Sequence, residues 1–144
     1  MIRKANMNDL PRLTELALEL WPDHAVDTMY YDLGKIMTGG ESVFFLAYRE
    51  DVAVGFAQCQ LRHDYVEGTS SSPVGYLEGI YVRKADREQG FAGQLMQACE
   101  AWAREEGCTE FASDCEIDNA ESLAFHLKLG FKEANRIICF AKQL

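Results

Sequence analysis

Apolar residues recur at intervals of three and four in two stretches near the start of the chain. The segment Leu13–Leu20 has leucine or alanine at positions 13, 16, 17 and 20, which places these side chains on one face of an α-helix. Trp21-Pro22 ends this helix, because the residue before a proline avoids the α region. A second helix is predicted over 26–37, with Gly39-Gly40 as its stop, and residues 2–5 can form a short strand.

The next part of the chain is rich in β-branched and aromatic residues instead. Ser42–Tyr48 reads SVFFLAY, and Val52–Leu61 returns after the polar turn 49–51, a pattern typical of a β-hairpin. The segment His63–Gly75 contains glycine, proline and several serines, the composition of a mobile surface loop. Tyr76–Val82 (YLEGIYV) then predicts a third strand.

Helical spacing returns at Gly90 and alternates with strand-like runs to the end of the chain. The predicted elements are a helix from Gly90 to about Glu106, a strand over Cys108–Cys115, a helix over Asn119–Leu129 ended by Gly130, and one or two strands over Phe131–Ala141. The expected order is β-α-α-β-β-β-α-β-α-β-β, in which a right-handed crossover joins a parallel pair of strands. The fold class is therefore α/β with a mixed central sheet. No repeat or linker is visible, so we expect one domain over residues 1–144.

Composition and charge narrow the class of partner. The 144 residues carry 14 Lys+Arg and 23 Asp+Glu, a formal net charge of −9, which argues against nucleic acid or an anionic membrane surface and suits a cationic partner. No apolar run approaches the roughly 20 residues that span a bilayer, and no signal peptide is visible. The five cysteines, odd in number and without a CxxC pair, indicate reduced thiols in a cytoplasmic protein. Any one could be a nucleophile, but small buried hydrophobes are the simpler interpretation.

The segment Val82–Gly93 has the features of a phosphate-binding turn. A strand ends, a polar turn follows, and a helix opens on small residues that let a ligand approach the backbone. The unpaired N–H groups of the first helical turn and the helix dipole favour an anion there. The small residues are Gly90, Ala92 and Gly93, and the basic residues before them are Arg83, Lys84 and Arg87. We predict a pyrophosphate site, the alternative being an ordinary strand-to-helix turn with basic residues; the chain has neither a Walker loop nor a GxGxxG after a first strand.

Two motifs in this half of the chain resemble a known family. Arg87-Glu-Gln-Gly90-Phe-Ala92 matches the R/Q-x-x-G-x-G/A signature of the GNAT superfamily of N-acetyltransferases, and Asn119 with Leu127-Lys-Leu-Gly130-Phe131 is similar to its second landmark. The resemblance implies acetyl-CoA as the acyl donor and no metal. It also implies that the pantetheine arm pairs like a strand with Ile80, Tyr81 and Val82 and contacts Asn119. The pyrophosphate would bind the backbone amides of Arg87, Glu88, Gln89, Gly90, Phe91, Ala92 and Gly93.

Three further segments resemble the aminoglycoside 6′-N-acetyltransferases within that superfamily. They are Trp21-Pro-Asp-His24, the loop end Ser-Ser-Pro-Val-Gly75, and Tyr76–Val82. Those enzymes acetylate the 6′ amine of aminoglycoside antibiotics and so confer resistance, which implies the same activity here, in a homodimer with the C-terminal strands as contact. Trp21, His24 and Tyr65 are then candidate substrate contacts, since aromatic rings can stack on sugars. The alternatives are a core position for Trp21 and a capping or surface position for His24.

Glu78 is the candidate proton acceptor for the attacking amine. It lies in an apolar strand, where a carboxylate is costly to bury unless it is paired, and a polycationic substrate would pair with it. By alternation we expect it to share a face with Tyr76, Ile80 and Val82. It could accept the proton directly or through water, or it could only bind the ammonium group. A solvent-facing carboxylate on an edge strand is the remaining alternative.

Acidic residues crowd the segment between Arg104 and Lys128, which contains seven Asp or Glu and no Lys or Arg. A negative rim of this kind concentrates cations near a site. Asp114 ends the predicted strand in this segment, the usual position for a ligand residue in a parallel sheet. We therefore predict that Asp114 contacts the substrate, and we assign no role to the other acidic residues.

Two positions depart from the family's pattern. Many members carry a tyrosine before the Leu-Gly-Phe turn, proposed to protonate the leaving thiolate, whereas this chain has His126 there. A histidine can donate a proton at neutral pH; it could equally be hydrogen-bonded elsewhere, and a coenzyme A thiolate can leave without an acid. Asn135-Arg136 stands where some related enzymes have an acidic residue before the final strand.

Two other functions fit the same residues. A GNAT enzyme that acetylates a polyamine or a protein amine would also use an acidic cleft. A non-catalytic acyl-CoA-binding module with a basic protein partner is the alternative from another class. Glu78 beside the predicted cofactor turn favours catalysis over the binding module.

Overall fold

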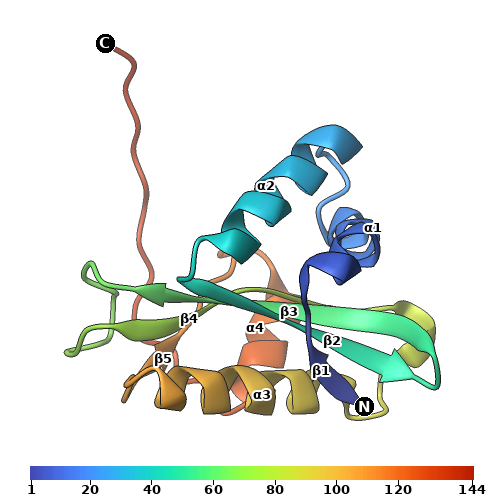
Figure 1. Ribbon diagram of the computed structural model, residues 1–144. Helices are drawn as coiled ribbons and strands as arrows, with labels where there is room; N and C mark the ends of the chain where they lie inside the picture. Colours follow the sequence, from blue (N-terminus) through green and yellow to red (C-terminus); the bar gives the residue numbers. More distant parts are fainter.

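Five strands form one sheet, with α1 and α2 on one face and α3 and α4 on the other (Figure 1). The computed structural model describes all of residues 1–144. The strands are β1 (Ile2–Lys4), β2 (Ser42–Arg49), β3 (Val52–Arg62), β4 (Val74–Val82) and β5 (Phe111–Ala112), and the helices are α1 (Leu10–Leu20), α2 (Val26–Thr38), α3 (Phe91–Glu105) and α4 (Ala120–Lys128). The sheet order is β1-β2-β3-β4-β5, and all neighbouring strands are antiparallel except the parallel pair β4 and β5.

Local signals set the ends of the helices and of the hairpin. α1 ends at Leu20, just before the Trp21-Pro22 dipeptide, and α2 ends at Thr38 with Gly39 as its cap. The hairpin turn between β2 and β3 places Glu50 in the left-handed region, at φ 55°. The elements predicted up to Val82, and the helices that became α3 and α4, agree with the structure to within about three residues at each end.

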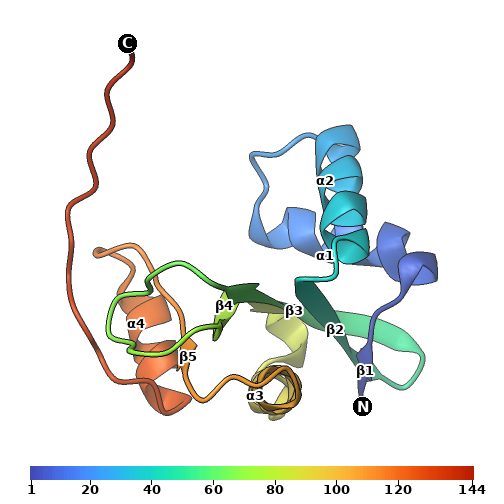
Figure 2. The same ribbon diagram turned by 60° about the vertical axis from the view of Figure 1, so that its left-hand side comes forward.

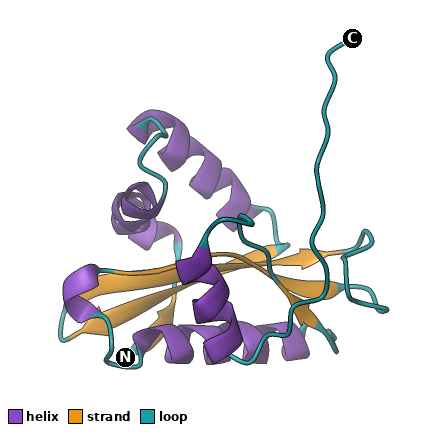
Figure 3. Ribbon diagram, turned by 180° about the vertical axis from the view of Figure 1, so that it is seen from behind, coloured by secondary structure: helices purple, strands orange, loops and turns teal.

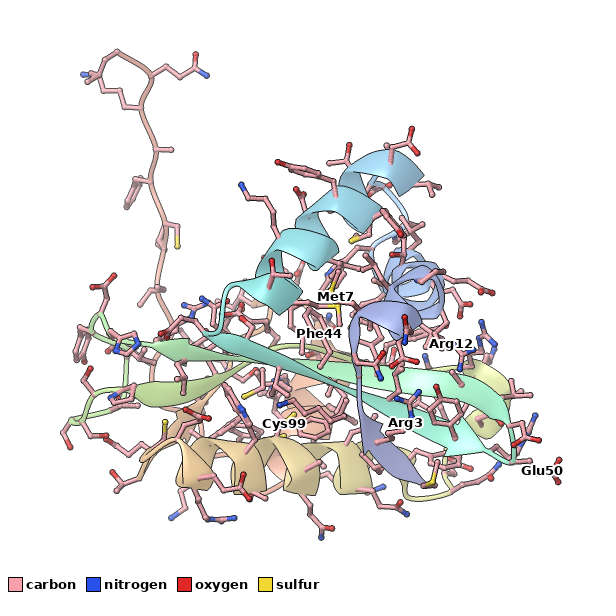
Figure 4. The ribbon with its side chains drawn as sticks, in the orientation of Figure 1. Arg3, Met7, Arg12, Phe44, Glu50 and Cys99 are labelled. Carbon is pink, nitrogen blue, oxygen red and sulfur yellow. The ribbon has the colours of Figure 1, made fainter.

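Apolar side chains hold the sheet from both sides. The cluster under α1 and α2 includes Leu13, Leu33 and Phe44, and the cluster over α3 includes Leu95 and Cys99. Figure 4 shows Phe44 and Cys99 on opposite faces of the sheet. Burial of one large apolar side chain is worth about 1.5–3 kcal/mol, so both layers stabilise the strands that carry the site. None of the helices has the length and apolar character needed to cross a membrane.

All five cysteines are free thiols, but their surroundings differ. Cys59, Cys99 and Cys108 are buried, whereas Cys115 and Cys139 are exposed. The interpretation as small buried hydrophobes is therefore right for three cysteines and wrong for two. The exposed pair lies in segments without regular structure.

The end of the chain departs from the prediction. The strand expected over 108–115 is limited to Phe111–Ala112, and no strand forms over 131–141. Residues 132–144 are exposed and leave the body as an extended arm (Figure 1 and Figure 2). A run of β-forming residues becomes a strand only when it has a hydrogen-bonding partner, and within one chain the arm has none. The prediction of one or two last strands is thus wrong for the single chain.

Candidate active site

The parallel strands β4 and β5 form a fork. They pair only where Gly75–Tyr76 meets Phe111–Ala112, while β4 continues to Val82 with β3 as its remaining neighbour. In the view from behind, α4 lies in front of the sheet (Figure 3). An open strand edge of this kind can bind an extended ligand through its main chain. Ile80, Tyr81 and Val82 lie on this open stretch of β4, and their contact with the pantetheine arm stays a prediction.

The start of α3 presents a row of unpaired N–H groups. Gly90 has φ 83° and precedes the helix, whose first internal bond runs from Gln94 N to Gly90 O (3.1 Å). The N–H groups of Phe91, Ala92 and Gly93 therefore have no partner in the helix. A Cβ at Gly93 would meet no atom within 4 Å, so a ligand can approach this backbone closely. The arrangement is an anion site and fits the predicted pyrophosphate.

The three residues before Gly90 leave the outer side of the turn open. Arg87 Nε donates to Val82 O (2.8 Å), and its guanidinium lies 5.8 Å from the centroid of the Tyr81 ring. Glu88 has φ 63°, and both Glu88 and Gln89 are exposed. Arg87 thus fastens the turn to the end of β4. Its own N–H donates to Lys84 O (3.4 Å), so the predicted bond from this amide to the pyrophosphate competes with a bond inside the turn.

Three ion pairs, made by Arg83 and Arg49, fix the position of this turn. Arg83 donates to Glu19 (2.8 Å) and Glu15 (3.2 Å) of α1, and the bond to Glu19 raises the pKa of Arg83. Arg83 therefore links α1 to the end of β4. Its place in the sequence suggested a charge free to bind phosphate, but in the structure it is already paired with two carboxylates. Asp86 is buried, with Arg49 Nη1 at 2.5 Å from its Oδ1.

A β-bulge interrupts β4 at Glu78. In the register with β3, Gln58 pairs with Gly79 and Cys59 with Leu77, so Glu78 has no partner. A bulge re-aims the side chains that follow it and leaves one residue outside the ladder of hydrogen bonds. The candidate base thus lies at the one irregular position in the pairing of β4 with β3.

The bulge decides which residues share a side with Glu78. Ile80 and Val82 pack into the cluster over α3, whereas Glu78 and Tyr76 both contact the guanidinium of Arg62. The expectation that Glu78 shares a face with Ile80 and Val82 is therefore wrong, because the extra residue shifts the alternation by one. Tyr76 does lie on the same side as Glu78.

Glu78 belongs to a hydrogen-bonded network at the fork. Arg62 Nε donates to Glu78 Oε1 (3.0 Å), and Nη2 donates to Oε1 (2.8 Å) and Oε2 (3.0 Å). The same guanidinium lies 3.5 Å from the centroid of the Tyr76 ring. Tyr76 in turn donates its hydroxyl to Asp114 Oδ2, and burial together with this bond raises the pKa of Tyr76. The two predicted acidic residues, Glu78 and Asp114, are thus joined through Arg62 and Tyr76.

His126 on α4 reaches the fork through a serine. Its Nδ1 lies 2.7 Å from Ser122 O, and its Nε2 lies 2.8 Å from Ser113 Oγ. A carbonyl only accepts, so Nδ1 carries a proton, and in the neutral imidazole Nε2 then accepts from the Ser113 hydroxyl. Ser113 follows β5 directly, and its Oγ is 3.3 Å from Leu77 O.

Of the predicted sugar contacts, Trp21 alone packs against the site. Its ring meets Phe56 edge-on with centroids 6.0 Å apart, and a Cβ at Gly79 would lie 2.6 Å from it, so it lies against β4 beside Glu78. His24 and Tyr65 are exposed, Tyr65 by 76%. The structure brings neither into the Glu78 network.

Two asparagines of the sequence analysis have local partners. Asn119 caps α4, its Oδ1 accepting from Ser122 N (3.0 Å). Asn135 donates from Nδ2 to Glu67 Oε1 (2.8 Å) in the loop before β4, which ties the base of the C-terminal arm to that loop. No group of three or more His, Cys, Asp or Glu side chains is arranged to hold a metal ion.

Sequence reasoning missed Arg62 and Ser113. The one signal for Arg62 is its place at the end of a predicted strand, directly before the loop 63–75. Ser113 precedes Asp114 and carried no signal of its own. Both act through partners distant in sequence, Glu78 and His126, which only the folded chain brings near.

The chain belongs to the acetyltransferase (GNAT) family, whose sequence model matches residues 7–131. The fork, the anion site at α3 and the mixed sheet are thus features of an N-acetyltransferase. The resemblance and the fold class inferred from the sequence are confirmed.

Individual relatives narrow the comparison further. An aminoglycoside N(6′)-acetyltransferase type 1 from Salmonella typhimurium is 40% identical over 142 residues, covering 99% of this chain and 98% of the relative. One from Stenotrophomonas maltophilia is 41% identical over 144 residues, covering 99% and 93%. The solved structure of AAC(6′)-Iy in complex with the bisubstrate analog CoA-S-monomethyl-acetylneamine has a TM-score of 0.95 at 40% identity, covering 100% of this chain and 98% of that chain. AAC(6′)-IG from Acinetobacter haemolyticus also has a TM-score of 0.95, at 36% identity, covering 100% and 99%.

Proposed function

We propose that this chain is an acetyl-CoA-dependent aminoglycoside 6′-N-acetyltransferase, which transfers an acetyl group to the 6′ amine of aminoglycoside antibiotics and so confers resistance. The observation that carries the proposal is the pair of carboxylates, Glu78 and Asp114, in one network at a fork that adjoins an anion site. A multiply charged amine would pair with both. Full-length similarity to aminoglycoside N(6′)-acetyltransferases supports this acceptor over a polyamine or a protein amine.

The donor would lie along the open edge of β4. The N–H groups of residues 87–93 would bind its pyrophosphate, Ile80, Tyr81 and Val82 would pair with its pantetheine arm, and Asn119 would contact that arm. This placement directs the thioester toward the bulge at Glu78. Trp21, His24, Tyr65 and Asp114 would contact the aminoglycoside, and the exposure of His24 and Tyr65 leaves them free to meet it.

The chemistry needs a free amine, a stabilised oxyanion and a leaving thiolate. Glu78 would accept the amine proton, directly or through water, as the N–C bond forms. Backbone N–H groups at the bulge would stabilise the oxyanion, and the C–S bond then breaks. The thiolate can leave as such. Alternatively, protonated His126 would donate from Nε2 to Ser113, whose hydroxyl would pass its own proton to the sulfur.

The test uses tobramycin or kanamycin with acetyl-CoA. We expect thiol release with the antibiotic, and mass spectrometry and NMR should show one acetyl group on the 6′ nitrogen. Parallel reactions with spermidine and a basic peptide separate the alternatives. If the thiol is released with the peptide alone, the chain is not an aminoglycoside acetyltransferase. If the chain binds acetyl-CoA but releases no thiol with any acceptor, it is better described as a non-catalytic acyl-CoA-binding module.

We further propose a homodimer held by the C-terminal arm. The arm exposes Ile137 by 64%, Ile138 by 80% and Phe140 by 90%, an unusual cluster of apolar side chains in water. β5 ends the sheet with an unpaired edge, which a strand from a second copy can extend. The predicted last strands would then form between two chains.

Removal of residues 137–144 should therefore convert the protein to a monomer. The cut spares Asn135 and its bond to Glu67, so the domain itself should stay folded. Analytical ultracentrifugation of the full-length and shortened chains measures the result, with circular dichroism as the control for folding. A full-length chain that sediments as a monomer at micromolar concentration would contradict the proposed dimer.

Two further proposals concern the domain organisation and the location of the reaction. Residues 1–144 would act as one acetyltransferase domain, since the family match and the single sheet span most of them. The reaction would take place in the cytoplasm, where acetyl-CoA is available and free cysteines stay reduced.

A further inference from the structure

We infer that Arg62 is a resident cation of the acceptor site: it occupies the place on Glu78 that the substrate ammonium takes, and it thereby selects acceptors with several positive charges. The inference rests on the proposed function, and it names the residue that sets the substrate class of the same site.

The bonds of Arg62 engage the whole carboxylate. Nε and Nη2 bond Oε1 at 3.0 and 2.8 Å, and Nη2 also bonds Oε2 at 3.0 Å. A guanidinium keeps its proton in proteins, so it is a permanent positive charge at this position. A carboxylate has about four acceptor positions, and Arg62 fills both on Oε1 and one on Oε2. An ammonium group that needs more than the one remaining position on Oε2 must therefore compete with the guanidinium.

Arg62 is able to move. Its side chain is 39% exposed, against 22% for Glu78. It is the last residue of β3 and directly precedes the loop 63–73. What holds it in place, apart from Glu78, is the stack on the Tyr76 ring at 3.5 Å. Tyr76 is itself fixed by its hydroxyl bond to Asp114.

Because an acceptor must displace Arg62 from Glu78, acceptors with several charges bind better than acceptors with one. A tethered guanidinium with several charge-assisted bonds is a strong competitor, and a free amine with one charge gains only the contact that the arginine gives up. An acceptor with several ammonium groups also pairs with Asp114, which compensates for the displaced bonds. Arg62 thus rejects single-charge amines rather than binding the correct substrate, a way to obtain specificity by penalising the competitor.

A second role is possible for an arginine in this place. It could stay on Glu78 throughout the reaction and only hold the carboxylate in position. The two roles predict opposite effects on a single-charge acceptor when the guanidinium is removed, so one variant distinguishes them.

The experiment compares kanamycin with 6-amino-6-deoxyglucose, a single amino sugar with one charge, in the variant Arg62→Met. Methionine keeps an unbranched stem against Tyr76 and removes the charge. We expect kcat/KM for the single amino sugar to rise about tenfold, while that for kanamycin changes less than about threefold. Arg62→Lys keeps a charge without the fork of donors. Its kcat/KM for the single amino sugar should therefore lie between the values of wild type and Arg62→Met. Arg104→Met removes the same charge from an exposed site on α3 and should leave the ratio of the two acceptors unchanged.

If Arg62→Met lowers kcat/KM equally for both acceptors, Arg62 positions Glu78 and does not select the acceptor. If kcat/KM of the variant equals that of wild type for both acceptors, Arg62 neither positions Glu78 nor selects the acceptor. Each result overturns the inference. Acetyl-CoA affinity of the variants reports whether they are folded. Wild-type protein that fails to acetylate kanamycin would instead contradict the proposed function. In that case calorimetry of the single amino sugar with CoA-saturated protein still tests Arg62, because the Arg62→Met variant should bind it about tenfold more tightly, and unchanged affinity would overturn the inference.

Discussion

Replacement of Glu78 by glutamine should lower kcat/KM for kanamycin about 10²- to 10⁴-fold at pH 7, the usual range for loss of a general base. Glutamine keeps the size of the side chain and one oxygen that Arg62 can bond, so the network at the fork should persist. The amine arrives mostly protonated at neutral pH, and the variant has no carboxylate to take that proton. At higher pH more of the free amine is present, so the difference from wild type should narrow.

A pH series from 6 to 9.5 measures this effect, with acetyl-CoA affinity as the control for folding. Glu105→Gln removes the same charge from the exposed end of α3 and should leave the profile unchanged. A rate ratio that stays flat across the series would reject the role of Glu78 as a base, although its role in binding the ammonium group would stand. An unchanged kcat/KM at pH 7 would reject both.

The helices and the hairpin could be predicted because their signals are local. Trp21-Pro22 stops α1 through a steric effect on one residue, and Gly90 marks the start of α3 because its φ of 83° suits glycine. The anion site follows from the same local fact, since the unpaired amides are those of the first helical turn. No partner elsewhere in the chain is needed for either feature.

The strands at the end of the chain and the faces of β4 could not be predicted in the same way. β5 shrinks to Phe111–Ala112 because β4 diverges from it, and the arm 132–144 has no partner in its own chain. The bulge at Glu78 depends on the register of Gln58 and Cys59 across β3. Period-two alternation assumes that no residue is inserted, so it placed Ile80 and Val82 on the wrong side.

The site also depends on contacts that span the sequence. Arg62 meets Glu78 only because β3 and β4 pair as a hairpin, and His126 meets Ser113 only because α4 returns beside the fork. A sequence reading can find an acidic residue in a strand, but it cannot tell which cation neutralises it. For this reason the candidate base was found from the sequence and its partner was not.

Gly93→Val should weaken acetyl-CoA binding about 10- to 100-fold with little change in stability. A Cβ at Gly93 meets no protein atom within 4 Å, and valine is a better helix former than glycine, so the fold should tolerate it. The added methyl groups would occupy the open space beside the first turn of α3, where the pyrophosphate is proposed to lie. Loss of one bond to a charged group, worth about 1.5–3 kcal/mol, gives an affinity change of that size.

Gly93 is a cleaner test of the pyrophosphate site than Gly90. At Gly90 the φ of 83° would strain any other residue, so weaker binding there would mix ligand and backbone effects. Ala101→Val introduces the same side chain at an exposed position of α3 and should leave the acetyl-CoA affinity unchanged. Calorimetric titration of the two variants and wild type, with thermal unfolding beside it, measures both quantities. If Gly93→Val binds acetyl-CoA as tightly as wild type, the pyrophosphate does not lie against Gly93 on the first turn of α3, and the proposed donor placement is wrong.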